Sequence, residues 1–185
     1  MELFEGNSTL YATILVDPPW SPLDQRRRPG HRVLRMQDVQ ELPVTRLAAA
    51  RSHLYLWSPN SLIPHALDVM KTWGFVHQTS LIWIKTLPDG RLSPERGGVY
   101  FRNATEMLLF GVRGEQWKRS RSQLPSNAVL APRSNTGRPD EIYRIIQRCS
   151  RGPFLELFAR TRRPGWDQWP SEPRMRKGAV RNSRR

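Results

Sequence analysis

Two consecutive prolines, Pro18 and Pro19, directly follow a short apolar run, and they constrain the fold more than any other feature of the sequence. The run covers residues 12–16 and is rich in β-branched side chains, which is typical of a buried strand. Proline donates no backbone hydrogen bond and holds the preceding residue extended, so the strand must end here in a rigid turn. Ligands bind at the carboxyl ends of strands in open α/β sheets. We therefore expect a binding site at this turn.

The turn presents a carboxylate on Asp17, two backbone carbonyls and the large flat ring of Trp20. Together these groups suit a planar molecule that carries an exocyclic amino group, such as a nucleobase. The alternative is a structural turn in which Asp17 caps the backbone and Trp20 belongs to the core. On their own, these residues favour the two interpretations about equally.

The composition indicates the class of partner. The 185 residues are enough for one domain, and they carry a net charge of +14. The basic excess is mostly arginine, which binds phosphate through planar, bidentate contacts. A polyanionic partner is therefore the leading interpretation, and a basic surface that only keeps the protein soluble is the alternative.

Other classes of protein are disfavoured by the same sequence. No apolar run approaches the roughly 20 residues that a membrane span needs, and the N-terminus lacks the regions of a signal peptide. The lone cysteine, Cys149, excludes an internal disulfide and a cysteine-based metal cage, and we expect it to be a buried structural thiol. We predict a cytoplasmic protein that needs no membrane and no metal.

Short apolar runs alternate with segments of helical periodicity along the chain. Strands are predicted at residues 12–16, 53–57, within 76–85, 106–112 and 154–158. Helices are predicted at residues 36–50, 62–73 and 140–149. The remaining segments are predicted loops at 21–32 and 86–102, a basic stretch without a clear pattern at 115–133, and a disordered basic tail from residue 174. This alternation indicates an α/β protein with a mostly parallel, doubly wound sheet.

Six motifs occur in a recognisable order: Asp-Pro-Pro-Trp at 17–20, Arg-Asn-Ala-Thr-Glu at 102–106, Leu-Phe-Gly-Val-Arg-Gly at 109–114, Arg-Pro-Asp-Glu-Ile-Tyr at 138–143, Leu-Glu-Leu-Phe-Ala-Arg at 155–160 and Gly-Trp-Asp at 165–167. They resemble the adenine-N(6) methyltransferase family that includes the catalytic subunit of the eukaryotic messenger-RNA adenosine methyltransferase. The likeness is greatest to its short bacterial and phage members, and it extends from about residue 12 to about residue 172.

The resemblance implies a Rossmann-like, S-adenosylmethionine-dependent methyltransferase fold, a permuted single domain in which the catalytic motif precedes the cofactor motif. We expect this domain to cover residues 1–172 and the basic tail to cover 173–185. The implied activity is methylation of the 6-amino nitrogen of adenine in nucleic acid, with DNA favoured over RNA by the bacterial and phage likeness. An RNA methyltransferase and a catalytically weak nucleic-acid-binding subunit are the alternatives, and a homodimer or heterodimer is compatible with each.

The resemblance also implies roles for particular residues. The catalytic motif is Asp17, Pro18, Pro19 and Trp20: Asp17 and the Pro18 carbonyl accept the two amino hydrogens, and Trp20 stacks on the base. Glu156 is placed to bind the cofactor ribose, and Arg138 is placed to pair with the methionine carboxylate. The full expected cofactor set is Asp17, Arg138, Glu156, Leu157, Phe158, Arg160 and Ser171, the last standing where bacterial relatives tend to have asparagine.

The expected substrate contacts fall into two groups. Trp20, His31, Asn103 and Glu106 are candidates for the wall of the base site, although Glu106 has an alternative interpretation as a charge on a sheet edge. The candidates for phosphate contacts are Arg26, Arg27, Arg28, Lys118, Arg119, Arg121 and the basic tail.

Overall fold

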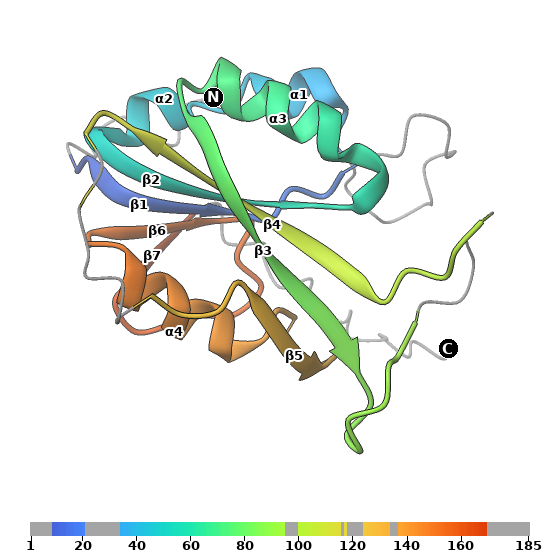
Figure 1. The fold of residues 1–185 in the computed structure, drawn as a ribbon. Coiled ribbons are helices and arrows are strands. Elements are labelled where there is room, and N and C mark those ends of the chain that lie inside the picture. Colours follow the sequence, from blue (N-terminus) through green and yellow to red (C-terminus); the bar gives the residue numbers. More distant parts are fainter. Residues whose placement is uncertain are drawn as a thin grey trace, which may run out of the picture.

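A single mixed sheet organises the fold, in the order β5-β3-β4-β2-β1-β6-β7 (Figure 1). The computed structural model describes residues 9–20, 34–94, 100–115, 117, 124–133 and 137–169. The strands are β1 (Tyr11–Val16), β2 (Ala48–Ser58), β3 (Val76–Thr86), β4 (Thr105–Arg113), β5 (Ala128–Pro132), β6 (Phe154–Leu157) and β7 (Trp166–Trp169). Among these, β4 runs antiparallel to both of its neighbours, and every other pair is parallel. The predicted mostly parallel α/β sheet, consistent with a Rossmann-like methyltransferase fold, is confirmed.

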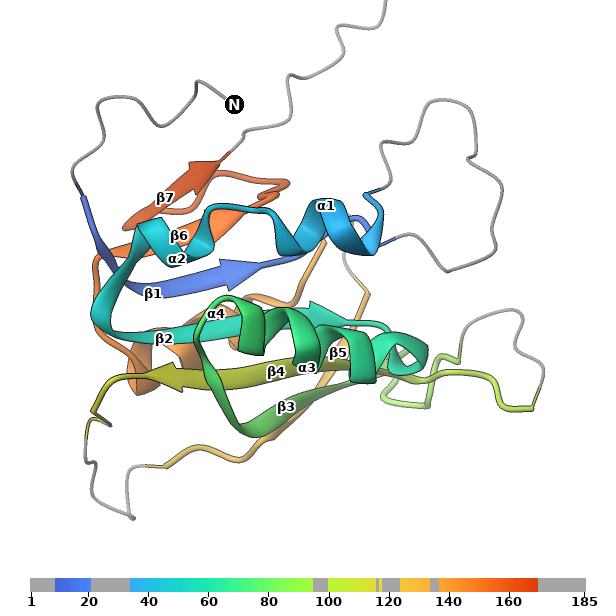
Figure 2. The same ribbon diagram turned by 90° about the horizontal axis from the view of Figure 1, so that it is seen from above.

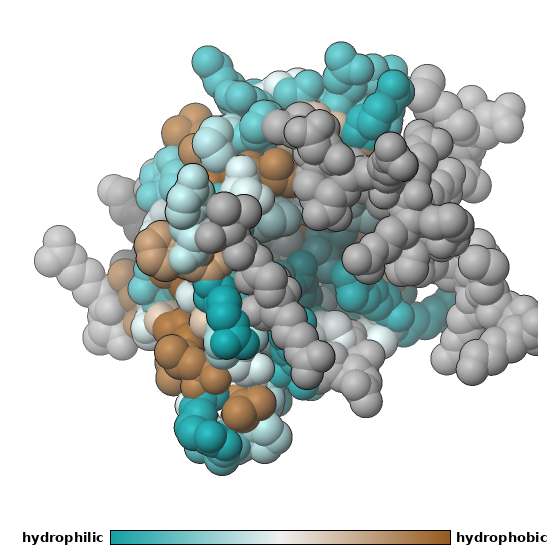
Figure 3. Space-filling view, turned by 90° about the vertical axis from the view of Figure 1, so that its right-hand side faces the viewer, coloured by the Kyte–Doolittle hydropathy of each residue, from teal (hydrophilic) through white to brown (hydrophobic). Residues whose placement is uncertain are grey.

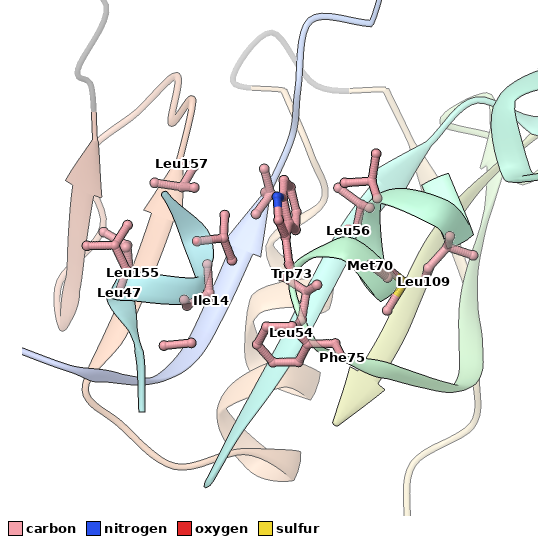
Figure 4. Packing of buried hydrophobic residues seen from close by; sticks show 14 of the residues in the cluster. Ile14, Leu47, Leu54, Leu56, Met70, Trp73, Phe75, Leu109, Leu155 and Leu157 are labelled. Carbon is pink, nitrogen blue, oxygen red and sulfur yellow. The ribbon is translucent and has the colours of Figure 1, made fainter. Parts of the chain in front are cut away.

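Helices cover both faces of the sheet (Figures 1 and 2). One face carries α1 (Met36–Gln40), α2 (Val44–Leu47), the 3-10 turn η1 (Asn60–Leu62) and α3 (Ile63–Thr72), and the other carries α4 (Asp140–Cys149). Each face has its own buried apolar cluster. Figure 4 shows the first cluster, in which Trp73 and Phe75 pack with Leu54 from the sheet. The sheet therefore has a separate core on each of its faces.

The predicted helix at residues 36–50 is wrong as a single element. Pro43 stands between α1 and α2. Since proline can begin a helix but cannot continue one, it divides the predicted helix in two. Residues 48–50 are already part of β2, where Ala48 pairs with Tyr11 of β1. The helical spacing of the apolar residues was real, but a distant strand determined where the helix had to end.

Two strands were not predicted. β5 lies within the basic segment that showed no pattern, and β7 follows the Gly165 turn. Both are short and lie at the two outer edges of the sheet. Edge strands bury little, so their alternation of apolar and polar residues is weak; Leu130 of β5 is exposed.

Other predictions have mixed outcomes. Gly74 follows α3 with a left-handed φ of 80°, which agrees with the predicted end of that helix at residue 73. Cys149 is only partly buried, not fully buried as expected. Within the described part of the chain, no helix has the length and apolar character required to cross a membrane. The whole predicted loop at 21–32 and the whole tail from 173 lie outside the described residues, so the domain boundaries stay predictions.

Candidate active site

The carboxyl ends of β1, β2 and β6 meet at one edge of the sheet, because these three neighbouring strands are parallel. Asp17 directly follows β1, and its backbone N–H donates to the carbonyl of Leu157 at the end of β6, at 3.3 Å. The Trp20 indole N–H donates to the carbonyl of Trp57 near the end of β2, at 2.8 Å. Figure 3 looks onto the side of the molecule toward which β1 and β2 run; hydrophilic residues gather in its central recess. The Asp-Pro-Pro-Trp turn and the end of β6, which the sequence predicts as the two parts of the site, thus lie together.

The turn itself differs from expectation in one respect. Its two carbonyls are not free: the Trp20 N–H donates to Pro18 O at 2.8 Å, and the Leu34 N–H donates to Pro19 O at 2.9 Å. Each carbonyl oxygen retains a second lone pair, so Pro18 can still accept a hydrogen from a ligand. Trp20 is partly buried against the core, which fixes its ring in place.

Four side chains of alternating charge lead from the interior to Asp17. Lys85 is only 1% exposed, and its Nζ lies 2.5 Å from Oε1 of Glu106. The other carboxylate oxygen of Glu106 bonds to Arg138 Nη1. Arg138 then donates to both oxygens of Asp17, from Nη2 to Oδ1 at 2.8 Å and from Nε to Oδ2 at 3.2 Å. We call Lys85, Glu106, Arg138 and Asp17 the charge series.

The position of Glu106 decides between its two interpretations. β4 lies between β3 and β2, so Glu106 does not stand on a sheet edge, and that alternative is wrong. Its neighbours on the same face are the rings of Trp57 and Trp83, whose centroids lie 4.2 and 5.9 Å from the guanidinium carbon of Arg138. A hollow of about 220 Å³ opens beside them, lined by Trp83, Glu106, Arg133, Gly137, Arg138 and Arg160. The charge series therefore borders a cavity.

Glu156 of β6 pairs with Leu15 of β1, two residues before Asp17, and is 4% exposed. Its Oε1 accepts a hydrogen bond of 2.7 Å from the Tyr143 hydroxyl, and its Oε2 is buried without a hydrogen-bond partner among the described residues. Burial raises the pKa of Glu156, and the nearby charge of Asp17 raises it further, while the Tyr143 bond opposes the change. A buried carboxylate oxygen without a donor is the arrangement that a ligand hydroxyl would satisfy.

Phe158 has a left-handed backbone at the end of β6, with φ of 65°. A large side chain at positive φ is strained, and such strain is concentrated at ligand sites. The Phe158 N–H donates to the Trp169 carbonyl of β7 at 2.9 Å, which holds this conformation. Two residues later, Arg160 Nη2 lies 3.7 Å from Asp17 Oδ2 with its side chain mostly exposed.

A family model described as MT-A70 matches residues 11–172. The chain belongs to the MT-A70 family. It is 29% identical over 160 residues to an N(6)-adenosine-methyltransferase MT-A70-like protein of Drosophila melanogaster, covering 84% of this chain and 26% of that protein. It is 28% identical over 160 residues to the human N(6)-adenosine-methyltransferase catalytic subunit METTL3, covering 84% of this chain and 27% of that protein. It is 27% identical over 146 residues to the Drosophila melanogaster N(6)-adenosine-methyltransferase non-catalytic subunit METTL14, covering 70% of this chain and 36% of that protein.

The resemblance stated from the motifs is thus confirmed. This MT-A70 chain spans about a quarter of the length of the first curated relatives it matches. The matched residues include the Asp-Pro-Pro-Trp turn, the charge series and Glu156.

The residues of this MT-A70 chain fit S-adenosylmethionine, the cofactor that the resemblance implies. The orphan oxygen of Glu156 can accept from ribose hydroxyls, and the guanidinium groups of Arg138 and Arg160 can bind a carboxylate. Leu157 is fully buried in the core, so only its backbone reaches the turn. No group of three or more potential metal ligands occurs among the residues that the structure describes.

Several expected site residues lie elsewhere or cannot be placed. Asn103 accepts a 3.4 Å hydrogen bond from the side-chain amide of Asn60, the first residue of η1. Outside the described residues lie Arg26, Arg27, Arg28, His31, Lys118, Arg119, Arg121 and Ser171.

Sequence reasoning missed Lys85, Tyr143 and the two tryptophans beside Arg138. Lys85 could have been found from the sequence, because it is a lone cation near the end of an apolar strand. A lysine buried at such a position needs an acidic partner. Tyr143 lies in the recognised motif at 138–143, but only the fold brings it against Glu156.

Proposed function

We propose that this chain transfers a methyl group from S-adenosylmethionine to the exocyclic 6-amino nitrogen of adenine in nucleic acid. The observation that carries the proposal is the position of Asp17. Its carboxylate is held by Arg138, which lines the hollow of about 220 Å³, and it is near enough to Glu156 for its charge to raise the pKa of that carboxyl group. One side of Asp17 can therefore hold an amino group and the other can hold the methyl donor.

The amino nitrogen of adenine is a weak nucleophile because its lone pair is delocalised into the ring. Asp17 accepts one of its hydrogens and Pro18 O accepts the other, which favours a tetrahedral nitrogen and localises its lone pair toward the methyl donor. S-adenosylmethionine, when bound, supplies a methyl group already activated by a positively charged sulfur. The work left to the protein is to position the amino group, and the Arg138 fork fixes the acceptor that does so.

DNA is the substrate we propose first, on the likeness to short bacterial and phage members. RNA fits the same site equally well, because both polymers present the same amino group and either can be bound with the base turned out of its stack. A weakly catalytic binding subunit is disfavoured by the presence of both Asp17 and Trp20, which a degenerate chain would be expected to lose.

A partner subunit, identical or different, is part of the proposal. Relatives are named as catalytic and non-catalytic subunits. Tyr100 and Phe101 of this chain, just before β4, are 89% and 84% exposed. Adjacent exposed aromatic rings are typical of a surface that another protein covers. The double change Tyr100→Ser with Phe101→Ser should abolish any dimer seen by light scattering, and a persistent dimer would remove this surface from the interface.

The test is methyl transfer from labelled S-adenosylmethionine to matched single- and double-stranded DNA and RNA oligonucleotides. Asp17→Asn keeps the shape of the side chain and removes its charge, so transfer should fall by about 10²–10⁴-fold. Arg162→Gln, which also removes one charge but at an exposed position, is the control. No transfer to any polymer by a wild-type chain that binds the cofactor would reject the proposed activity.

Salt dependence tests the expected phosphate contacts. If the basic tail contacts phosphates, deletion of residues 174–185 should flatten the dependence of log affinity on log salt. An unchanged slope would remove the tail from the interface.

A further inference from the structure

A second and larger hollow lies away from the candidate active site. Its volume is about 420 Å³, and its walls include His53, Tyr55, Thr79, Phe110, Trp117 and Cys149. No residue of the charge series or of the Asp-Pro-Pro-Trp turn lines it. The proposed methyl transfer therefore leaves this hollow without a role.

The two hollows open along the same face of the sheet. Side chains two residues apart on a strand point to the same face, so on β2 the row is His53, Tyr55 and Trp57. On β4, Phe110 lines the larger hollow and Glu106, four residues earlier, lines the smaller one. Separations of two to four residues along these strands correspond to about 7–13 Å. The fully buried side chains of Trp57 and Leu108 lie between the two hollows on this face, so a nucleic-acid strand that reaches both must run over the surface around them, along a path longer than that separation.

Aromatic rings form one wall of the larger hollow. The His53 ring lies 4.3 Å from Trp117 and 4.9 Å from Phe110, and the Tyr55 and Phe110 rings lie 5.0 Å apart, measured between centroids. Ser150 holds this wall from behind, with its Oγ 2.7 Å from His53 Nδ1 and 2.8 Å from the Tyr55 hydroxyl. The wall is therefore ordered before any ligand arrives, which lowers the entropy cost of binding a flat group.

Two exposed arginines flank the same wall. The guanidinium carbons of Arg51 and Arg151 lie 5.4 and 5.7 Å from the Trp117 ring centroid. The Arg51 Nε–H donates to the Glu115 carbonyl at 2.9 Å, which directs this side chain along the surface. Aromatic faces next to guanidinium groups are what single-stranded nucleic acid meets in its binding proteins: bases stack and phosphates pair.

We propose that this hollow, which we call the ring pocket, binds a second base of the strand whose adenine is held at Asp17, while Arg51 and Arg151 contact that strand's phosphates. The identity of the partner rests on the proposed function. The net charge of +14 and the two arginines favour a polyanion over an apolar protein segment. A free small molecule is the alternative occupant that the test distinguishes.

The test uses the full chain and labelled single-stranded 12-nucleotide DNA and RNA probes with one central adenine, with affinity read by fluorescence anisotropy. Removing single bases one position at a time should find one position near the adenine whose loss weakens wild-type binding by at least about fivefold. Trp117→Ala should weaken binding of the intact probe by a similar factor, and the loss of that base should then have no further effect. Trp117→Phe, which keeps a ring, should restore most of the affinity.

Charge and cysteine chemistry give independent checks. Arg51→Ala and Arg151→Ala should each lower the slope of log affinity against log salt by about one. Arg91→Ala, an equal loss of charge beyond the C-terminal end of β3, is the control, and it should leave the position-specific loss of affinity intact. Cys149 is the single cysteine of the chain and lines the ring pocket, so the bound probe should slow its alkylation.

Two results would overturn the inference. Equal losses of affinity at every abasic position would mean that no base enters the ring pocket. Additive losses for Trp117→Ala and base removal would mean the same. A mononucleoside that competes for the pocket equally well whether or not the strand is bound would identify a free small ligand instead. Methyl transfer is measured on the same samples. If no transfer occurs while the position-specific loss holds, the proposed activity fails and the ring pocket stands.

Discussion

The guanidinium of Arg138 grips the carboxylate of Asp17 with two hydrogen bonds, of 2.8 and 3.2 Å, across 121 positions of sequence. The acceptor that the turn after β1 presents is therefore oriented by a residue two positions before the start of α4. A carboxylate has about four lone-pair positions, so this grip leaves Asp17 able to accept from an amino group as well. The pair joins the early motif of the chain to its late one.

Arg138→Lys tests whether the fork itself matters. Lysine keeps the positive charge but cannot donate two parallel hydrogen bonds, so kcat/KM for methyl transfer should fall by about tenfold or more. Arg162→Lys, the same exchange at an exposed position, should leave kcat/KM unchanged. An Arg138→Lys enzyme with wild-type kcat/KM would mean that charge alone suffices at this position.

Lys85→Met tests the buried start of the charge series. The change removes the ammonium from a nearly fully buried position and leaves Glu106 paired with Arg138. The free energy of unfolding should therefore drop by about 1–3 kcal/mol in urea titrations. Glu106 is partly exposed, which keeps the loss below that of a fully buried pair. In the double variant with Glu106→Leu the two losses should not add. Additive losses would show that the pair is not coupled.

How much of this site follows from sequence depends on how local its causes are. The turn after β1 was predictable because Pro18 and Pro19 act on their own backbone. The end of α2 was not, because Ala48 pairs with a strand 37 positions away. Likewise no local pattern shows that Lys85, Glu106 and Arg138 meet, since their contact depends on which strands become neighbours. Glu156 was recognised by its motif, but its burial and its Tyr143 partner required the fold.

Glu156→Gln should separate stability from cofactor binding. Because burial raises the pKa of Glu156, the folded state holds this proton more tightly than the unfolded chain does. The resulting stabilisation is complete below the ordinary pKa of 4.5 and is lost as the pH rises through the raised value, so at neutral pH the buried charge costs stability. The variant removes that charge and keeps an oxygen for Tyr143. It should therefore flatten the fall in Tm above pH 4.5 and melt higher than wild type at pH 7, by about 2–4 °C for each kcal/mol recovered.

The cost of that gain should appear in binding. Without a carboxylate to accept from ribose hydroxyls, the Glu156→Gln variant should bind S-adenosylhomocysteine about tenfold more weakly or worse by calorimetry. Glu141→Gln, an exposed change on the first turn of α4, should alter neither property appreciably. Lower stability of Glu156→Gln at pH 7 would show that the carboxylate is stabilising in the folded protein, contrary to the expected sign.

Phe158 allows strain and ligand contact to be separated. Its φ of 65° suits glycine, so Phe158→Gly should relieve backbone strain that Phe158→Ala retains. Both variants lose the same aromatic ring, and the difference between them therefore isolates the backbone. We expect the glycine variant to be more stable than the alanine variant by about 1 kcal/mol in chemical unfolding, and both to bind S-adenosylhomocysteine more weakly than wild type. Equal stability of the two variants would mean that the Trp169 hydrogen bond no longer holds residue 158 in the left-handed region once the ring is gone. Unchanged affinity for S-adenosylhomocysteine would mean that the Phe158 ring does not contact the cofactor.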